Sequence, residues 1–305
     1  MISFFKGLLK QEEGNAVLLI SLSMVALLTM VGLVIDGGNL MLNRAKLQKT
    51  ANAAVLSGAQ ELTNTELKVN EVIQTILREH EEEDSLQDIV VSMEDKVSID
   101  LEKQVPLTFS RLFGRETAPV SAHAAAELGV MGRAKGAAPL GIDESIELEY
   151  FKEYKLKVDQ TDVDQGYFGV LALGGTGSET YEENLRHGYQ NEIKVGDVLD
   201  TQTGNIAGKT RTVVRERVNG CSENPRDVND RDCSRVILIP VYEALGDPDK
   251  QLKSVRVKGF AYFYITDPMS ATDTAITGMF IKRAGTGFTK PDSVAHGAFS
   301  IRLTE

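Results

Sequence analysis

Two glycine-rich stretches have residue types that could hold an anion. The segment Gly204–Thr210 (GNIAGKT) shares its ending with phosphate-binding loops, in which backbone amides and a lysine hold nucleotide phosphates. That motif also needs a glycine five residues before Gly208, where this chain has Thr203. The run that follows, Arg211–Val218, has the pattern of a strand and not of a helix. We therefore interpret the segment as a turn between strands.

The other stretch, Leu173–Thr180 (LGGTGSET), could present backbone amides to an anion at the start of a helix. It holds no lysine and no paired acid, and Ser178 serves equally well as the cap of that helix. Capping is the simpler interpretation, and an anion site is the alternative.

The acidic residues within Asp159–Asp164 raise the question of calcium, which carboxylate oxygens bind well. An EF-hand loop needs Asp or Asn at its fifth position, Gly at its sixth and Glu at its twelfth. Counted from Asp162, those positions hold Gly166, Tyr167 and Leu173. We interpret the segment as a solvated acidic loop, with a calcium site of another kind as the alternative.

Residue types for catalysis are not grouped in the sequence. A Gly-x-Ser-x-Gly segment is absent, and the histidines lack zinc-ligand spacing: His80, His123, His187 and His296. We therefore predict no catalytic, cofactor-binding or metal-binding residues, no cofactor and no small-molecule substrate, so that the protein is not an enzyme. The formal net charge of −11 argues against nucleic acid as a partner, because phosphate binding needs a basic surface.

The two cysteines, Cys221 and Cys233, lie in a polar stretch and lack the C-x-x-C spacing of a metal site. In an oxidising compartment such a pair forms a disulfide, whereas in a cytosol both would stay free thiols. We predict a disulfide between them if this part of the chain is exported.

The N-terminal part of the sequence contains an uncharged apolar run, Asn15–Ile35. At ~1.5 Å per residue, a helix of this length spans about 31 Å, close to the ~30 Å hydrocarbon core of a bilayer. A buried helix of a soluble protein usually keeps a polar stripe, so the run predicts a transmembrane helix. A cleaved signal peptide is the rival interpretation, but its apolar region would be ~7–15 residues long and end in a small-residue cleavage site.

The residues after this run continue a helical pattern without a proline, as a stem beyond the membrane. Small residues recur at Thr50, Ala54 and Gly58. Their spacing of four places them on one helix face and lets another backbone approach closely. We predict a helix-packing surface, filled either by the protein's own sheet or by a partner helix.

The segment from Gly14 to Ala59 resembles the N-terminal module of TadE/TadG-like proteins of Flp-type (tight adherence) pilus assembly. The similarity lies in a glycine-preceded apolar helix, the aspartate that follows it (Asp36), the run Ala45–Gln48 and an alanine-rich helix over Ala51–Ala59. The segment Phe109–Gly114 is also similar to a turn of TadG-like proteins.

The orientation of the anchor rests on this resemblance. Basic residues flank the apolar run on both sides, and long downstream domains translocate largely regardless of charge. The resemblance implies a cell-membrane protein with a single span, a cytoplasmic N-terminus and extracytoplasmic C-terminal domains. The cysteine pair is compatible with that orientation.

The expected fold class is α+β: an N-terminal transmembrane helix continuing into a pilin-like helical stem with a small antiparallel sheet, followed by a mostly β domain. The predicted organisation is a cytoplasmic N-terminus (1–14), a transmembrane helix (15–35), a pilin-like TadE/TadG-like α+β domain (36–130) and a mostly β extracytoplasmic domain (131–305). The boundary is placed in the Gly-, Ala- and Pro-rich stretch Met131–Asp143. Helices are predicted at Asn64–Glu83 and Ser178–Tyr189, a hairpin from Ile89–Met93 to Val97–Leu101, and strands at Leu148–Val158, Phe168–Leu173, Arg211–Val218, Val236–Pro240, Val255–Ile265, Ile276–Arg283 and Ala298–Leu303.

The resemblance implies a component of a Flp/Tad-type pilus assembly or secretion system that acts by protein–protein interaction. Its expected partners are the lipid bilayer and other pilus assembly proteins or pilins. The alternative is a membrane-tethered surface enzyme or adhesin that uses the pilin-like module only as an anchor. A cleft in the β domain lined by clustered acids with a bound metal would favour that alternative.

Overall fold

The computed structural model describes residues 15–158, 168–202, 206–221, 227–246, 252–291 and 293–304. The predicted N-terminal segment 1–14, the aspartates of Asp159–Asp164 and the start of the Gly204–Thr210 segment lie outside these residues. The chain forms two compact units. The first comprises Met1–Ala54, Gln74–Val90 and Ser98–Ala124, and the second comprises Val55–Ile73, Val91–Val97 and Ala125–Glu305.

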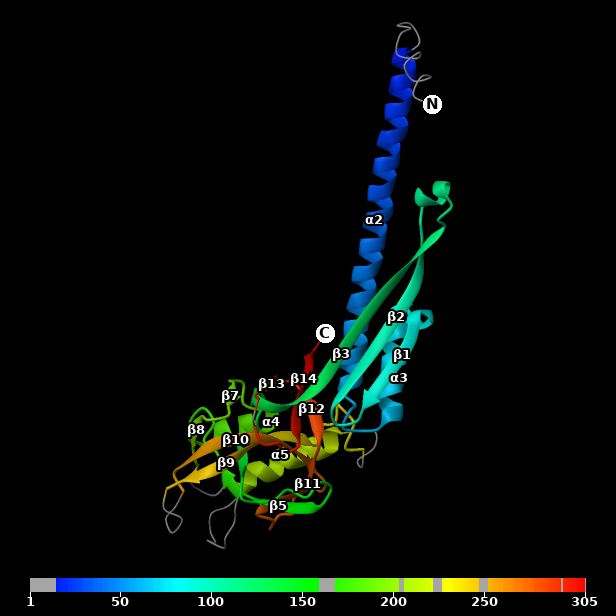
Figure 1. Cartoon of the computed structure of the whole chain (residues 1–305). Helices are drawn as coiled ribbons and strands as arrows, with labels where there is room; N and C mark the ends of the chain where they lie inside the picture. Colours follow the sequence, from blue (N-terminus) through cyan, green and yellow to red (C-terminus); the bar gives the residue numbers. More distant parts are fainter. Residues whose placement is uncertain are drawn as a thin grey trace. The chain divides into compact units, whose positions relative to one another are not determined.

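Helix α2 (Asn15–Ala59) is one continuous helix that begins in the apolar run and ends after the small-residue segment (Figure 1). In the described part of the chain, it is the one helix long and apolar enough to cross a membrane, by length and composition. Its large side chains from Val17 to Ile35 are exposed, as lipid-facing side chains are. Burial begins at Gly32 and Asp36 and becomes regular from Leu47 onward.

The sheet of the first unit follows the strand order β1-β2-β3. Its strands are β1 (Leu86–Ser92), β2 (Lys96–Pro106) and β3 (Thr117–Ala134), and the short helix η2 (Ser110–Phe113) lies in the loop between β2 and β3. Buried residues alternate along β2 and β3, which gives the sheet one apolar face. Gln48 of α2 donates a hydrogen bond to the His123 carbonyl of β3 at 2.6 Å, so this helix lies along the sheet.

Most strands of the second unit form another sheet, in the order β5-β11-β10-β9-β4-β6 with β8 on β10. Its strands are β4 (Leu140–Asp143), β5 (Glu153–Lys157), β6 (Phe168–Val170), β8 (Val198–Asp200), β9 (Val236–Leu245), β10 (Ser254–Ile265) and β11 (Ala275–Ile281). The remaining strands are β7 (Ile193–Lys194), β12 (Arg283–Gly285), β13 (Phe288–Thr289) and β14 (Ala298–Leu303). Of these, β7, β13 and β14 pair with β3, and β14 also pairs with β12.

Three further helices are α3 (Glu66–Glu79), α4 (Ser178–His187) and α5 (Ala207–Gly220), with the short helix η1 at Glu83–Ser85. Helices α4 and α5 supply Tyr181, Leu185, Val213 and Val214 to the same apolar core as strands β9, β10 and β11. The fold is therefore α+β, with a long apolar N-terminal helix and a mostly β second part.

The predicted strand Arg211–Val218 is wrong, because these residues belong to α5. The buried residues of α5 include Ala207, Thr210, Val214 and Val218, three to four positions apart. This spacing is the period of a helix face. The adjacent valines Val213 and Val214 also fit a strand, so the helical period was not recognised in the sequence. A following strand therefore no longer speaks against a phosphate loop, whereas Thr203 at the position of the required glycine still does.

Two other differences concern the predicted boundary. Strand β3 continues through residues 130 and 131 to Ala134, and β4 lies inside the stretch Met131–Asp143 in which the boundary is predicted. The placement of a domain boundary there stays a prediction. The hairpin from β1 to β2 and the helix α4 are confirmed, and α3 is shorter than expected at both ends.

Candidate functional site

Asp36 lies in the first unit, one position after the apolar run, and is 3% exposed. Its carboxylate accepts backbone hydrogen bonds from the loop between β2 and β3. Oδ1 accepts from the amides of Thr108 at 2.8 Å and Phe109 at 3.2 Å, and Oδ2 from those of Phe109 at 3.1 Å and Ser110 at 2.6 Å. The carboxylate thus holds three successive amides at the start of η2, where a helix terminus favours negative charge.

The electrostatics of Asp36 follow from this geometry. Burial raises the pKa of a carboxyl group, but hydrogen bonds from Ser110, Thr108 and Phe109 outweigh burial here and lower the pKa of Asp36 to about 2. The side chain is therefore ionised at physiological pH. We call Asp36 and the three amides the Asp36 clamp.

The Asp36 clamp gives a testable expectation. In Asp36→Asn, the remaining side-chain oxygen can still accept a hydrogen bond, but the new NH2 group is a donor and would face the Ser110 N–H, which is also a donor. We therefore expect the loop to detach from α2. Amide hydrogen exchange should then rise at residues 108 to 110. Asp95→Asn, at an exposed aspartate, is the matched control. Unchanged exchange in Asp36→Asn would show that the loop is held without the charge.

The three predicted small residues of α2 are all buried. Gly58, in the second unit, faces α3: a Cβ at Gly58 would lie 2.7 Å from Cγ1 of Ile73 and 3.6 Å from Cγ1 of Val69. The neighbour at this position is thus a helix and not the sheet that the sequence led us to expect. Whether the face of Thr50, Ala54 and Gly58 also binds a partner stays a prediction.

Cys221 and Cys233 form a disulfide, as predicted, with a Cα–Cα distance of 4.7 Å. It is buried beside Tyr264 and Ile281 in the second unit. The Asp230 carboxylate lies within 4.8 Å of both sulfurs, an arrangement that would suit a metal if the cysteines were thiolates. The disulfide removes that ligand set, because oxidised sulfurs are not thiolate ligands.

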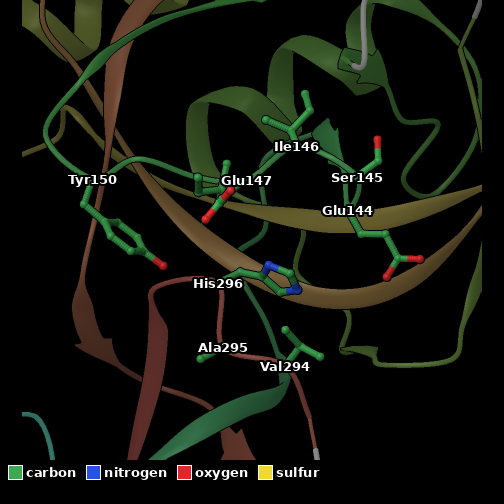
Figure 2. A pocket seen from close by; sticks show the side chains of 9 residues that line it. Glu144, Ser145, Ile146, Glu147, Tyr150, Val294, Ala295 and His296 are labelled. Carbon is green, nitrogen blue, oxygen red and sulfur yellow. The ribbon is translucent and has the colours of Figure 1, made fainter.

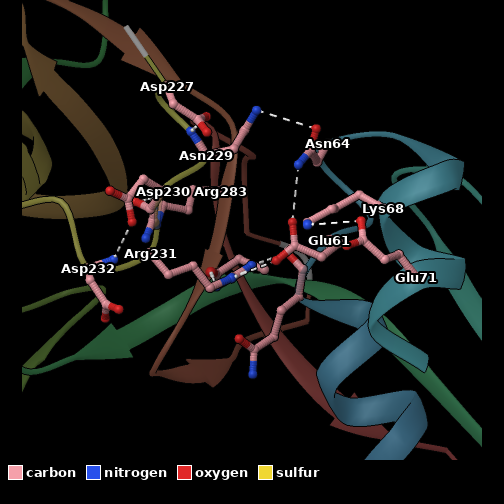
Figure 3. A network of polar contacts seen from close by, with 12 residues as sticks. Glu61, Asn64, Lys68, Glu71, Asp227, Asn229, Asp230, Arg231, Asp232 and Arg283 are labelled. Atoms are coloured by element: carbon pink, nitrogen blue, oxygen red, sulfur yellow. Dashed lines mark hydrogen bonds and ion pairs between the residues drawn. The ribbon is translucent and has the colours of Figure 1, made fainter. Parts of the chain in front are cut away.

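The residues before Cys233 join a polar network with the turn that follows α2 (Figure 3). Arg231 donates to Oε1 of Glu61 at 2.8 Å, to the Ala284 carbonyl at 3.1 Å and to the Gln60 carbonyl. Glu61 also accepts from Asn64 at 3.2 Å. Glu61 is only 8% exposed, so this pair is more protected from solvent and salt than a surface ion pair.

Helix α2, Asp36 and Glu61 lie in one segment that matches a known protein family. Residues 14–61 match the family described as putative Flp pilus-assembly TadE/G-like. The match confirms the resemblance inferred from the sequence. We call residues 14–61 the TadE/G-like segment; it contains α2, Asp36, the three small residues and Glu61. No match was found among curated proteins or among solved structures.

A shallow hollow lies outside the TadE/G-like segment, in the second unit (Figure 2). It is lined by Glu144, Ser145, Ile146, Glu147, Leu148, Tyr150, Val294, Ala295 and His296. Carboxylates, an imidazole and a phenol are the residue types of acid–base catalysis. Nε2 of His296, however, is buried without a hydrogen-bond partner among the described residues, and Glu144 forms an ion pair with Lys258 at 3.5 Å. Among the described residues, His296 is thus not paired through Nε2 with a nucleophile.

His296 should make stability depend on pH. Burial lowers the pKa of His296 below its ordinary value, although Glu144 acts in the opposite direction. The folded state therefore favours the neutral ring, and the unfolded state takes up the proton first as the pH falls below ~6.5. We expect His296 to stabilise the fold above that pH and to lose this contribution below it.

The measurement is urea unfolding of the detergent-solubilised chain over a pH series. His296→Gln should flatten the loss of stability below the ordinary histidine pKa, whereas His80→Gln, at an exposed histidine, should not. An identical pH profile for His296→Gln and the unchanged protein would contradict the expectation.

Sequence reasoning did not find several residues of these sites. Asp36 was noted as part of the resemblance, but its partners lie more than seventy positions away, and no local pattern indicates them. Glu61 and Arg231 were not singled out, because an ion pair between distant segments has no spacing signature. His296 was considered only for zinc, and its hollow is formed by two segments remote in sequence.

Proposed function

We propose that the protein is a single-pass, membrane-anchored component of a Flp/Tad-type pilus assembly system that acts through protein–protein contacts. The observation that carries the proposal is that residues 14–61, which match the TadE/G-like family, coincide with the helix that is able to span a membrane. In this proposal residues 15–35 cross the membrane, and residues 36–130 form a pilin-like domain. The role needs no catalytic step.

We further propose that the N-terminus is cytoplasmic and that the chain after α2 is extracytoplasmic. The Cys221–Cys233 disulfide supports this orientation, because disulfides persist in oxidising compartments and are rare in the cytosol. A membrane-impermeant maleimide should therefore label Gln87→Cys, an exposed position of β1, on intact cells. Labelling only after lysis would refute the orientation.

The assembly role is tested by deletion and complementation in the source cells. Loss of the gene should abolish assembled Flp pili, and the full chain should restore them. A chimera in which residues 15–35 are replaced by an unrelated transmembrane helix separates anchoring from contact. We expect it to reach the membrane but to restore pili poorly if the matched helix makes specific contacts. If the deletion strain still assembles normal Flp pili, the proposal is wrong.

A further inference from the structure

The loop between β2 and β3 presents two large apolar side chains at its tip. Leu112 is 80% exposed and Phe113 is 68% exposed, although both follow a strand whose apolar residues are buried. They lie in η2, beside Arg111. Exposed apolar side chains that cluster in this way mark a contact surface.

The same loop runs along the apolar part of α2, as Figure 1 shows within the first unit. A groove is lined on the helix side by Val25, Leu28, Thr29 and Leu33, and on the loop side by Phe109, Ser110, Leu112 and Phe113. Val25 precedes the end of the apolar run at Ile35 by ten residues, or ~15 Å of helix at ~1.5 Å per residue. The groove therefore overlaps about half of the ~30 Å hydrocarbon layer that α2 is long enough to cross.

The sequence of α2 leaves room for the loop at this level. A Cβ at Gly32 would lie 2.6 Å from both Cβ and Cγ of Phe109, so only glycine permits this approach. Gly32 and Asp36 are one turn apart, and both are buried, whereas the large apolar side chains of the run are exposed. At the neck of the loop, Asn39 also donates to the Pro106 carbonyl at 3.3 Å. Gly32, Asp36 and Asn39 thus contact this loop from successive turns of α2.

The backbone of the loop suits a medium without water. Its first amides donate to Asp36, and the amides of Leu112, Gly114 and Arg115 donate to carbonyls within the loop at 3.0, 3.1 and 3.2 Å. Gly114, at φ 85°, supplies the left-handed turn that closes η2. Backbone groups without a partner would be costly in hydrocarbon, and these six amides all have one.

We infer that the tip of this loop is a second membrane contact, in which Leu112 and Phe113 insert into the leaflet beside α2 and an acyl chain of that leaflet fills the groove. The inference rests on the proposed membrane anchoring by α2. It commits to lipid as the occupant, because a surface continuous with residues 25 to 33 of the spanning helix lies in the layer that those residues cross. Arg111 is exposed and long enough to direct its charge to the lipid headgroups.

The test places a fluorescent probe on an introduced cysteine in the full chain, reconstituted into phosphatidylcholine vesicles without other proteins. The native cysteines are joined to each other, so the label goes to the new thiol. The probe is placed at Leu112→Cys. Met30→Cys, an exposed position of the apolar run, reports lipid, and Gln87→Cys reports water. Lipids with a nitroxide on the acyl chain and aqueous iodide are the two quenchers.

We expect the Leu112 probe to lose fluorescence to the nitroxide lipid as the Met30 probe does and to resist iodide. If the Met30 probe is quenched by lipid and the Leu112 probe by iodide, the inference is overturned and a protein partner becomes the occupant of the groove. If the Met30 probe itself is quenched only by iodide, the membrane anchoring fails and the inference fails with it.

A paired substitution separates insertion from mere proximity to the bilayer. Gly32→Leu should displace Phe109 and move the Leu112 probe toward iodide, whereas Gly37→Leu should not, because a Cβ at Gly37 meets no atom in the described part of the chain within 4 Å. Equal effects of both substitutions would show that α2 does not position the loop and would overturn the inference.

Discussion

Replacing both cysteines with serine is expected to lower the free energy of unfolding by about 3 kcal/mol, the value of the chain-entropy model for a loop of this length. Cys221 and Cys233 are 7% and 5% exposed, so each serine also buries a hydroxyl where an apolar sulfur packed. An unpaired buried hydroxyl adds ~1–3 kcal/mol. The disulfide also closes the segment that carries Arg231 to Glu61, so that contact should weaken with it.

Urea unfolding of the detergent-solubilised chain measures this effect. Chemical reduction of the unchanged protein should reproduce most of it, while leaving the serine variant unaffected. A stability of the serine variant equal to that of the oxidised protein would mean that the loop is already ordered without the bridge. Free thiols in unreduced, denatured protein from cells would contradict the disulfide and weaken the proposed orientation.

Gly58→Leu is expected to destabilise the second unit by about 3 kcal/mol, at the upper end of typical overpacking. A Cβ at Gly58 would already lie 2.7 Å from Cγ1 and 2.8 Å from Cδ1 of Ile73, so α3 has to move. Sequence reasoning predicts that Gly58→Ala is mild or helpful, because glycine in a helix interior costs about 1 kcal/mol relative to alanine. The contact with Ile73 reverses this expectation, and we expect Gly58→Ala to destabilise as well.

The matched control is Gly208→Leu in α5, where a Cβ would meet no atom of the described residues within 4 Å. Combining Gly58→Ala with Ile73→Val, which removes Cδ1, one of the two close atoms, should recover part of the loss in a double-mutant cycle. If Gly58→Leu leaves the melting temperature unchanged but reduces co-purification of other pilus proteins, the face binds a partner and is not an internal contact. No effect on either property would show that its small residues do not matter.

Much of the architecture could be predicted from local patterns. The apolar run and the absence of proline indicated a helix from Asn15 to Ala59, and alternation indicated β9, β10, β11 and β14. Helix α5 was missed, because two adjacent valines fit a strand as well as a helix over a short window. The strand β4 was missed, because Gly, Ala and Pro around it are typical of linkers.

The candidate sites were less predictable, for a physical reason. The cysteine pair is a chemical signal that the sequence carries by itself, and the disulfide was predicted from it. The Asp36 clamp depends on backbone amides, which every residue type supplies, so no residue identity reveals the partner of the carboxylate. The small residues indicated a close approach, but only the fold shows that Ile73 is what approaches Gly58.

The position of β14 has a consequence for how the chain folds. This strand pairs with β3 antiparallel, Phe299 opposite Val130, and with β12 in parallel. From the time β3 forms until residues near 300 are available, that side of β3 presents unpaired backbone groups. An open strand edge is a template for pairing with another chain, and contacts so distant in sequence form slowly. The folding protein therefore passes through a period in which the β3 edge is open to pairing with another chain, and arrival of β14 ends it.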